Sequence, residues 1–181
     1  MKKINDFIYI VAITNRPMTL NEIKKTEEFY SFFAAAYNYC SLIEKSHHYT
    51  EKKFLSDIRK HLLEIYSRAL EIPKIEIIYS EVFDPIVDVK SQLNKLNNLV
   101  EGKLYWTPQE PMSLNNYLIE RGDIVSDLIT IYRHLKKSIL LFKTNNKNAQ
   151  IDAIWQFKFD FQTHWEKRCV NALFAIQSEL Q

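Results

Sequence analysis

The chain has 181 residues, of which 46% are hydrophobic and 25% are charged, and its formal net charge is +2. This composition is typical of a soluble globular domain and excludes disordered, collagen-like and mucin-like classes. Only two glycines occur, Gly102 and Gly122, which argues against phosphate-binding loops and all-β folds with many tight turns. The net charge is too small to indicate a polyanionic partner by itself.

The N-terminal region, residues 1–18, is predicted to be an arm or extension ahead of a helical domain over residues 19–181. Its apolar run, residues 7–13, is far shorter than the ~20 residues that a membrane-spanning helix requires. The residues after it, 15–17, lack the small side chains of a signal-peptide cleavage site. We therefore predict a cytoplasmic protein that does not bind membranes.

Two helices are predicted in the first part of the domain. Thr19 and Glu22 have the spacing of a capping box, which predicts a helix from residue 19 to near His47. Thr50 is the predicted N-cap of a second helix, which Pro73 ends. Both segments repeat apolar residues every three or four positions, as one buried helix face requires.

The middle of the chain is predicted to be less regular. Residues 75–79 alternate like a short strand and are interpreted as an extended connector. Asp84 followed by Pro85 predicts the start of a helix, and Gly102 its end. Residues 103–113 are then expected to form one longer structureless loop, and long loops are often functional.

Two more helices are predicted after this loop. Ser113 is a candidate N-cap for the first, and Gly122 is expected to break or bend it. Residues 125–142 have a strong amphipathic pattern and are predicted to form the next helix.

The last segment is ambiguous because its aromatic residues alternate with polar ones, as in a half-buried strand. Read as a helix, the segment has two aromatic faces: Trp155 with Phe159, and Phe157 with Phe161 and Trp165. The helical period continues to the C-terminus without a turn signal, so we predict a helix packed against two neighbours. The predicted fold is therefore all-α, a single-domain bundle of about five or six helices with one longer loop.

Three segments resemble the bacterial family known as domain of unknown function 5063: FAAAYNYCSLIE, DLITIYRHLK and IDAIWQFKFDFQTHWEKRCVNAL. The resemblance extends from about residue 26 to the C-terminus and implies an all-α protein with no assigned activity. Positions matching the recurrent family pattern are Cys40, Asp127, Tyr132, Trp155, Phe161, His164, Trp165 and Ala172. The chain departs from that pattern at Glu166, where a glycine commonly follows the tryptophan.

The sequence offers little sign of catalysis or of a cofactor. Three carboxylate and imidazole pairs have helical spacing: Glu44 with His47, Asp57 with His61, and Asp160 with His164. Di-iron bundles need two Glu-x-x-His motifs, and only the first pair has that spacing. Cys40 and Cys169 form no C-x-x-C motif, have no histidine within four residues, and are predicted to be buried thiols in a reducing compartment. We predict no catalytic residue, metal or other cofactor.

The leading functional hypothesis is a non-catalytic bundle that acts through protein–protein interaction, with a homo-oligomer as one option. Its contact surface would comprise residues 103–112 and the final helix. The alternative is an enzyme, or a bundle that binds a small ligand or metal, with a site near Tyr132, Trp155, His164 and Trp165. A structural role for His164, donating a hydrogen bond to a carboxylate such as Asp160, is favoured over a functional one. The candidate binding residues are Trp106, Tyr132, Trp155, His164, Trp165 and Arg168.

Nucleic-acid binding is the disfavoured alternative. The C-terminal segment interleaves basic and aromatic residues, but the aromatic residues belong mostly to the predicted buried faces. Such binding would also require one continuous basic face. The residues that would have to form that face are Lys136, Lys137, Lys143, Lys147 and Lys158.

Overall fold

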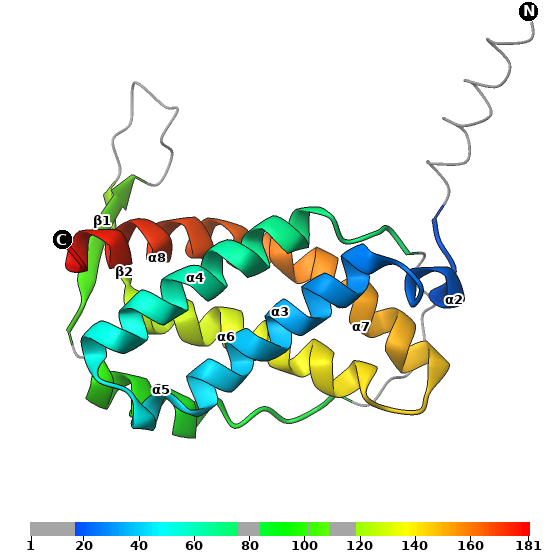
Figure 1. The fold of residues 1–181 in the computed structure, drawn as a ribbon, viewed down its shortest axis with the longest axis horizontal. Helices are drawn as coiled ribbons and strands as arrows, with labels where there is room; N and C mark the ends of the chain where they lie inside the picture. The colour runs from blue at the N-terminus through cyan, green and yellow to red at the C-terminus, as the bar shows by residue number, and fades with distance from the viewer. Residues whose placement is uncertain (1–16, 76–83, 101, 109–118) are drawn as a thin grey trace, which may run out of the picture.

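The computed structural model describes residues 17–75, 84–100, 102–108 and 119–181 (Figure 1). The helices are α2 (Leu20–Ile23), α3 (Glu27–Glu44), α4 (Glu51–Leu70), α5 (Val89–Leu99), α6 (Ile124–Phe142), α7 (Lys147–Asp160) and α8 (Glu166–Glu179). A 3₁₀ turn, η1 (Ser46–His48), follows α3, and a π-helical turn, η2 (Phe161–Trp165), joins α7 to α8. Two strands, β1 (Leu104–Pro108) and β2 (Ile119–Asp123), form a small sheet.

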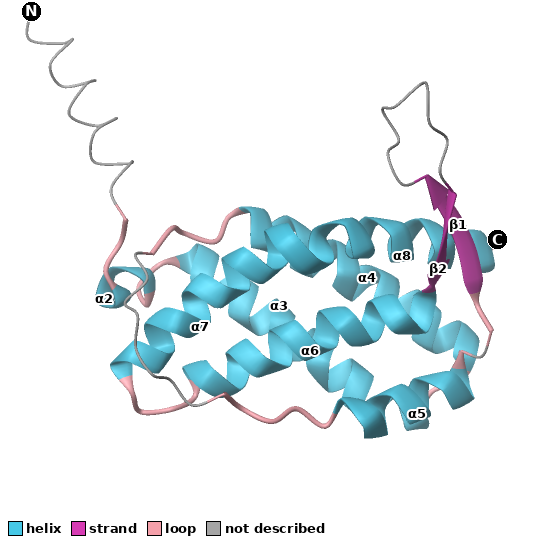
Figure 2. Ribbon diagram, turned by 180° about the vertical axis from the view of Figure 1, so that it is seen from behind, coloured by secondary structure: helices cyan, strands magenta, loops and turns pink. Residues whose placement is uncertain are grey.

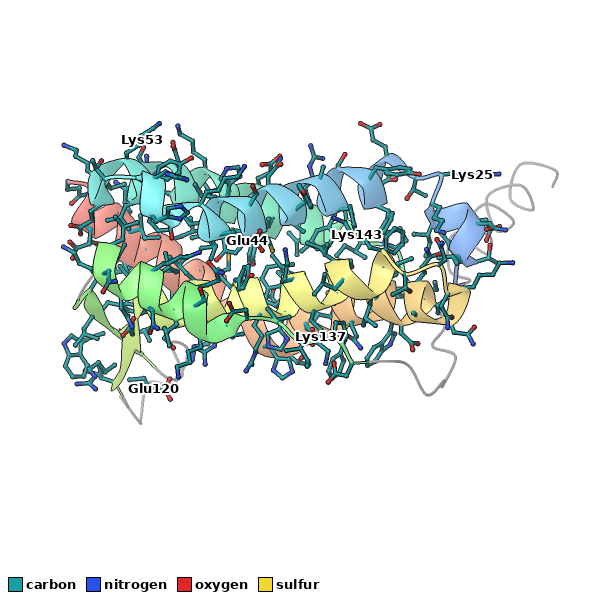
Figure 3. The ribbon with its side chains drawn as sticks, turned by 90° about the horizontal axis from the view of Figure 1, so that it is seen from below. Lys25, Glu44, Lys53, Glu120, Lys137 and Lys143 are labelled. Carbon is teal, nitrogen blue, oxygen red and sulfur yellow. The ribbon has the colours of Figure 1, made fainter. Side chains whose placement is uncertain are left out.

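The helices form a bundle around α6, which contacts α3, α5, α7 and α8. Figure 3 shows α3 and α4 on one side of the bundle and α6 and α7 on the other. Helix α8 contacts both α4 and α6, and the two strands lie beside its C-terminal end (Figure 2). The predicted all-α bundle is therefore confirmed. Within the described ranges, every helix is too short or too polar to cross a membrane.

The first predicted helix is divided into two. The capping box is confirmed, because the backbone N–H of Thr19 donates to the Glu22 carboxylate at 2.8 Å. Helix α2 ends after one turn, however, where the Thr26 hydroxyl donates to the Ile23 carbonyl at 2.9 Å. The same hydroxyl oxygen accepts the N–H of Phe29 and so caps α3. The prediction of one helix to residue 47 was wrong, because this threonine competes for the backbone groups that would continue it.

Helix α4 and the segment after it follow the sequence pattern closely. Thr50 precedes α4 and Pro73 lies shortly after its end, as predicted. Ile75 then pairs with Met18 in an isolated parallel bridge, and the N–H of Met18 donates to the Lys74 carbonyl at 3.0 Å. The rest of the predicted connector lies outside the described residues, as do residues 1–16 of the predicted arm.

Helix α5 begins four residues later than predicted. Asp84 does not cap it; instead the Asp88 carboxylate accepts the backbone N–H of Ser91 at 3.1 Å. Two aspartates therefore compete as N-caps, and the one that reaches a free N–H starts the helix. Gly102 lies just beyond the helix with a φ of 70°, a left-handed conformation that suits a helix end, as predicted.

The two strands correct both predictions for the region after α5. Residues 104–108 are a strand rather than part of a structureless loop, and they pair antiparallel with β2 so that Tyr105 lies opposite Gly122. Gly122 neither breaks nor bends a helix. It leaves room for the Tyr105 ring, because a Cβ at this position would overlap that ring. Ser113, the predicted helix cap, lies outside the described residues.

The C-terminal segment is helical, and its two aromatic faces are confirmed. The buried face carries three rings, Phe157, Phe161 and Trp165. Trp155 and Phe159 point away from the core and are partly exposed. The predicted regular helix is interrupted by η2, in which the N–H of Glu166 donates to the carbonyl of Phe161, five residues earlier. Such π-helical turns are rare and often occur at functional sites.

Candidate functional site

Two clefts adjoin along α6 on the face where it meets α7, η2 and α8. The first has a volume of about 510 Å³ and lies between α6, α7, η2 and residues 84–89. The second has a volume of about 650 Å³ and lies between α6, η2, α8 and the two strands. Arg133, His134 and His164 line both clefts. We call the two clefts together the histidine groove.

The imidazole of His134 is held by a partner at each ring nitrogen. Its Nδ1 lies 2.9 Å from Oδ2 of Asp160, and its Nε2 lies 3.2 Å from Nη2 of Arg133. A guanidinium group can only donate hydrogen bonds, so Nε2 accepts and Nδ1 carries the proton that is donated to Asp160. The contacts therefore fit a neutral imidazole in one tautomer and one orientation.

His164 lies directly against His134. The two imidazole rings stack with centroids 4.6 Å apart and planes inclined by 16°. Nε2 of His164 is 3.9 Å from Oδ1 of Asp160, which is too long for a hydrogen bond. The predicted carboxylate partner of His164 is therefore nearby, but His134 holds it instead. The His164 side chain is 48% exposed and that of His134 only 13%, so His164 is the more accessible of the two imidazoles.

Four rings follow one another along the groove, and we call them the ring row. Trp155 stacks on Phe159 with centroids 4.6 Å apart, and Phe159 meets His164 edge-on at 6.1 Å. The stack of His164 on His134 completes the row. The rings come from α7, η2 and α6, and η2 positions the single ring, His164, that joins the other three.

Two guanidinium groups in the groove lack a carboxylate partner. Among the described residues, Arg121 and Arg133 form no ion pair, and both line the groove. Arg168, in contrast, pairs with Asp127 at 2.8 Å. The Asp160 carboxylate is already bound to His134. The unpaired guanidinium groups favour an anion in the groove, since a concave basic surface concentrates anions.

One buried carboxylate ties the strands to the bundle. Asp127, on α6, accepts the hydroxyl hydrogen bond of Tyr105 and the guanidinium hydrogen bond of Arg168. Burial raises the pKa of Asp127 above its ordinary value, although both hydrogen bonds and the charge of Arg168 lower it. Burial, followed by the contact with Asp127, also raises the pKa of Tyr105.

The raised pKa of Asp127 gives a pH dependence with a definite sign. An acid with a higher pKa in the folded state binds more protons when folded, so the free energy of unfolding falls as pH rises between the two pKa values. Asp127→Asn does not titrate. Its stability relative to wild type should therefore rise as the pH increases above about 4, the ordinary pKa of an aspartate, measured by urea denaturation. If the stability of Asp127→Asn relative to wild type stays constant or falls as the pH rises, the raised pKa of Asp127 is contradicted.

The structure separates the candidate binding residues into three groups. Trp155, His164 and Arg168 line the histidine groove. Tyr132 is buried and donates its hydroxyl hydrogen bond to Glu44 on α3, at 3.0 Å, and Trp165 is fully buried in the core. Trp106 is exposed on β1. Two of the four residues proposed together for a site thus share the groove, while the other two hold the bundle together.

Sequence analysis missed the residues of α6 that complete the groove, among them Arg133 and His134. A signal for this face was present. Four polar residues at helical spacing form a stripe along α6, and all four line the groove: Asp127, Thr130, His134 and Lys137. The stripe identifies a face of α6 that is not core, but the sequence alone does not show what that face meets.

The remaining titratable candidates are engaged elsewhere. Glu44, of the Glu-x-x-His pair, accepts the Tyr132 hydrogen bond and pairs with Lys136 at 2.5 Å. No cluster of His, Cys, Asp and Glu in the part of the chain that the structure describes is arranged to hold a metal ion. Both cysteines are buried and unpaired, and burial raises the pKa of Cys169 to about 12 and that of Cys40 well above its ordinary range.

The lysines considered for nucleic-acid binding contact different elements. Lys136 pairs with Glu44 on α3, and Lys143 lies over the Tyr37 ring at 4.6 Å, also on α3. Lys158 donates to the last carbonyls of α4, and Lys137 pairs with Asp84 at 2.9 Å. These contacts direct the charges to separate parts of the bundle rather than to one phosphate-binding face.

The fold and the groove define a class of protein: a small helical bundle with a polar groove along its central helix. The chain belongs to the family described as Domain of unknown function (DUF5063), whose model matches residues 23–180. It is also similar to the crystal structure of protein BF1032 from Bacteroides fragilis, with a TM-score of 0.75 and 19% identity, covering 88% of this chain and 96% of that one. At this identity the likeness concerns the fold alone. The comparison with curated proteins found no match.

Proposed function

We propose that this protein binds a small anionic ligand in the histidine groove. The observation that carries the proposal is the unpaired guanidinium of Arg133, placed where the two clefts adjoin and beside the stacked imidazoles of His134 and His164. Guanidinium groups bind carboxylates and phosphates through paired, charge-assisted hydrogen bonds. Both clefts have the volume of ordinary small-molecule sites. This proposal develops the alternative raised by the sequence, a ligand site near Trp155 and His164.

Contacts within the protein already orient the side chains that would bind an anion in the groove. Asp160 fixes the imidazole of His134, and Arg133 is anchored at one end by its contact with that ring. Asp127 fixes Arg168 at the neighbouring end of the groove. Because these donors are already oriented, their side chains lose little conformational entropy when an anion binds.

The test is a calorimetric titration of the protein with inorganic pyrophosphate at low ionic strength. Arg133→Ala should weaken binding about 10-fold to 100-fold, the effect of losing one charge-assisted hydrogen bond. The matched control is Arg68→Ala, on α4, because Arg68 is also partly exposed but pairs with Glu71 away from the groove. Equal binding by both variants, or no binding by the wild type, would contradict the proposal.

A second candidate function is interaction with another protein or self-association. Two large apolar side chains on α8, Val170 and Phe174, lie one turn apart and are exposed, Phe174 by 70%. Trp106 is exposed on β1, whose neighbour Thr107 contacts Asn171 of α8. Exposed apolar groups at adjacent positions favour an interface. Analytical ultracentrifugation over a range of concentrations tests this: Phe174→Ser should lower any association, and a monomer at every concentration would exclude self-association.

We also propose that the protein acts in the cytoplasm. Its two cysteines are buried and unpaired in the structure, and this use of cysteine suits a reducing compartment. Fractionation of the source cells tests the proposal, which recovery of the protein in a secreted or periplasmic fraction would overturn.

A further inference from the structure

We infer that the anionic ligand also carries a planar aromatic ring, as a nucleoside monophosphate does, and that this ring lies against the ring row. The inference rests on the proposed anion binding and names the class of ligand. It depends on a juxtaposition: the ring row leads from Trp155 and Phe159 in the first cleft directly to His164 and His134, beside Arg133.

The first cleft offers an aromatic wall that the bundle does not use for its own packing. Phe159 is 40% exposed although it lines a concave surface, and Trp155, stacked on it, is only partly covered. Pro85, Val87 and Val89 add apolar side chains to the lining of the same cleft. A cleft lined by aromatic and apolar side chains suits a flat ring, because binding there removes the ring from water.

His164, His134 and Arg133 line this cleft as well. His164 is 6.1 Å from Phe159 between ring centroids, and the next ring, His134, contacts Arg133. One ring and one anionic group joined by a short linker can therefore reach both parts of the groove. Stacking on aromatic side chains tolerates different bases, since every base has a π-face, so the inference concerns the class of ligand rather than one base.

A small ligand fits these contacts better than a nucleic-acid strand. A strand requires a basic track that continues beyond the first phosphate. Here Lys136, Lys143 and Lys158 are directed to α3 and α4 by their own contacts. Arg121 and Arg133, which form no ion pair among the described residues, both line the groove.

The experiment compares three probes on the full-length protein by calorimetry: inorganic phosphate, ribose 5-phosphate and adenosine 5′-monophosphate. We expect the wild type to bind the adenosine compound at least about 10-fold more tightly than ribose 5-phosphate, because only the former stacks. Phe159→Leu keeps an apolar side chain but removes the ring, and should abolish that difference. Arg133→Ala should weaken both phosphate esters alike.

Matched controls show whether a variant binds less tightly because it lost a contact to the ligand or because it is no longer folded. Tyr30→Leu removes an exposed ring on α3 that lines neither cleft, and should leave all three affinities unchanged. Circular dichroism should give the same helical signal for every variant. Equal affinity of the wild type for ribose 5-phosphate and adenosine 5′-monophosphate would overturn this inference and leave anion binding intact. Failure of all three probes to bind would overturn the proposed function as well.

Discussion

Replacing Trp165 with alanine should lower the free energy of unfolding by about 3–5 kcal/mol, the usual cost of truncating a buried aromatic side chain. The Trp165 side chain is fully buried at the end of η2, with its ring edge-on to Phe161 at 4.7 Å. The cavity would open at the point where α7 joins α8, so both helices would lose packing there. Urea denaturation followed by circular dichroism measures the change.

Two further variants make this result interpretable. Phe174→Ala, on exposed surface of α8, should change stability by less than about 0.5 kcal/mol. Trp165→Phe should cost less than the alanine variant, because it keeps most of the ring and removes an indole N–H that has no hydrogen-bond partner among the described residues. If Trp165→Ala costs no more than Phe174→Ala, the packing described at η2 is wrong.

Replacing Gly122 with alanine should destabilise the protein by about 1–3 kcal/mol, the usual cost of overpacking. The added methyl group would overlap the Tyr105 ring, so the ring would have to leave its place between the strands and α6. Its hydroxyl would then lose the hydrogen bond to Asp127. Because this contact holds the strands against the groove, the variant should also weaken ligand binding. Denaturation and the calorimetric titration measure the two effects.

The other glycine supplies the control. Gly102 has no atom within 4 Å of an added Cβ, but its φ is 70°, so Gly102→Ala should cost about 1–2 kcal/mol through the backbone alone. In a Tyr105→Ala background the overlap at Gly122 disappears. The cost of Gly122→Ala should vanish there, whereas that of Gly102→Ala should persist. A cost at Gly122 that is the same in both backgrounds would show that the ring is not its cause.

The candidate site was only partly accessible from the sequence. His164 and Trp155 stood out because they interrupt or border an aromatic stripe. His134 and Arg133 did not stand out, since they lie on α6, far from His164 along the chain. Their role depends on the packing of α6 against α7 and η2, which the sequence does not show. The carboxylate of Asp160 illustrates the same point: its helical spacing suggested His164 as a partner, yet the closer imidazole comes from the neighbouring helix, at 2.9 Å.

The helical periods and caps identified the bundle, the first capping box, the end of α4 and the two aromatic faces of the last segment. These features depend on residues within a few turns of each other, so local spacing is sufficient to specify them. The second cap at Thr26, the late start of α5 at Asp88 and the π-helical turn were not foreseen. Each depends on which of several available hydrogen bonds is formed, and packing decides between them.

The sequence by itself determined that this chain is a helical bundle, because apolar periodicity is a property of each helix alone. Only the tertiary structure decided that Gly122 pairs two strands, that His134 stacks on His164, and that Arg133 is left unpaired in a groove. Those features join residues distant in the chain, and the interactions between these residues form only when α6 packs against α7, α8 and the strands.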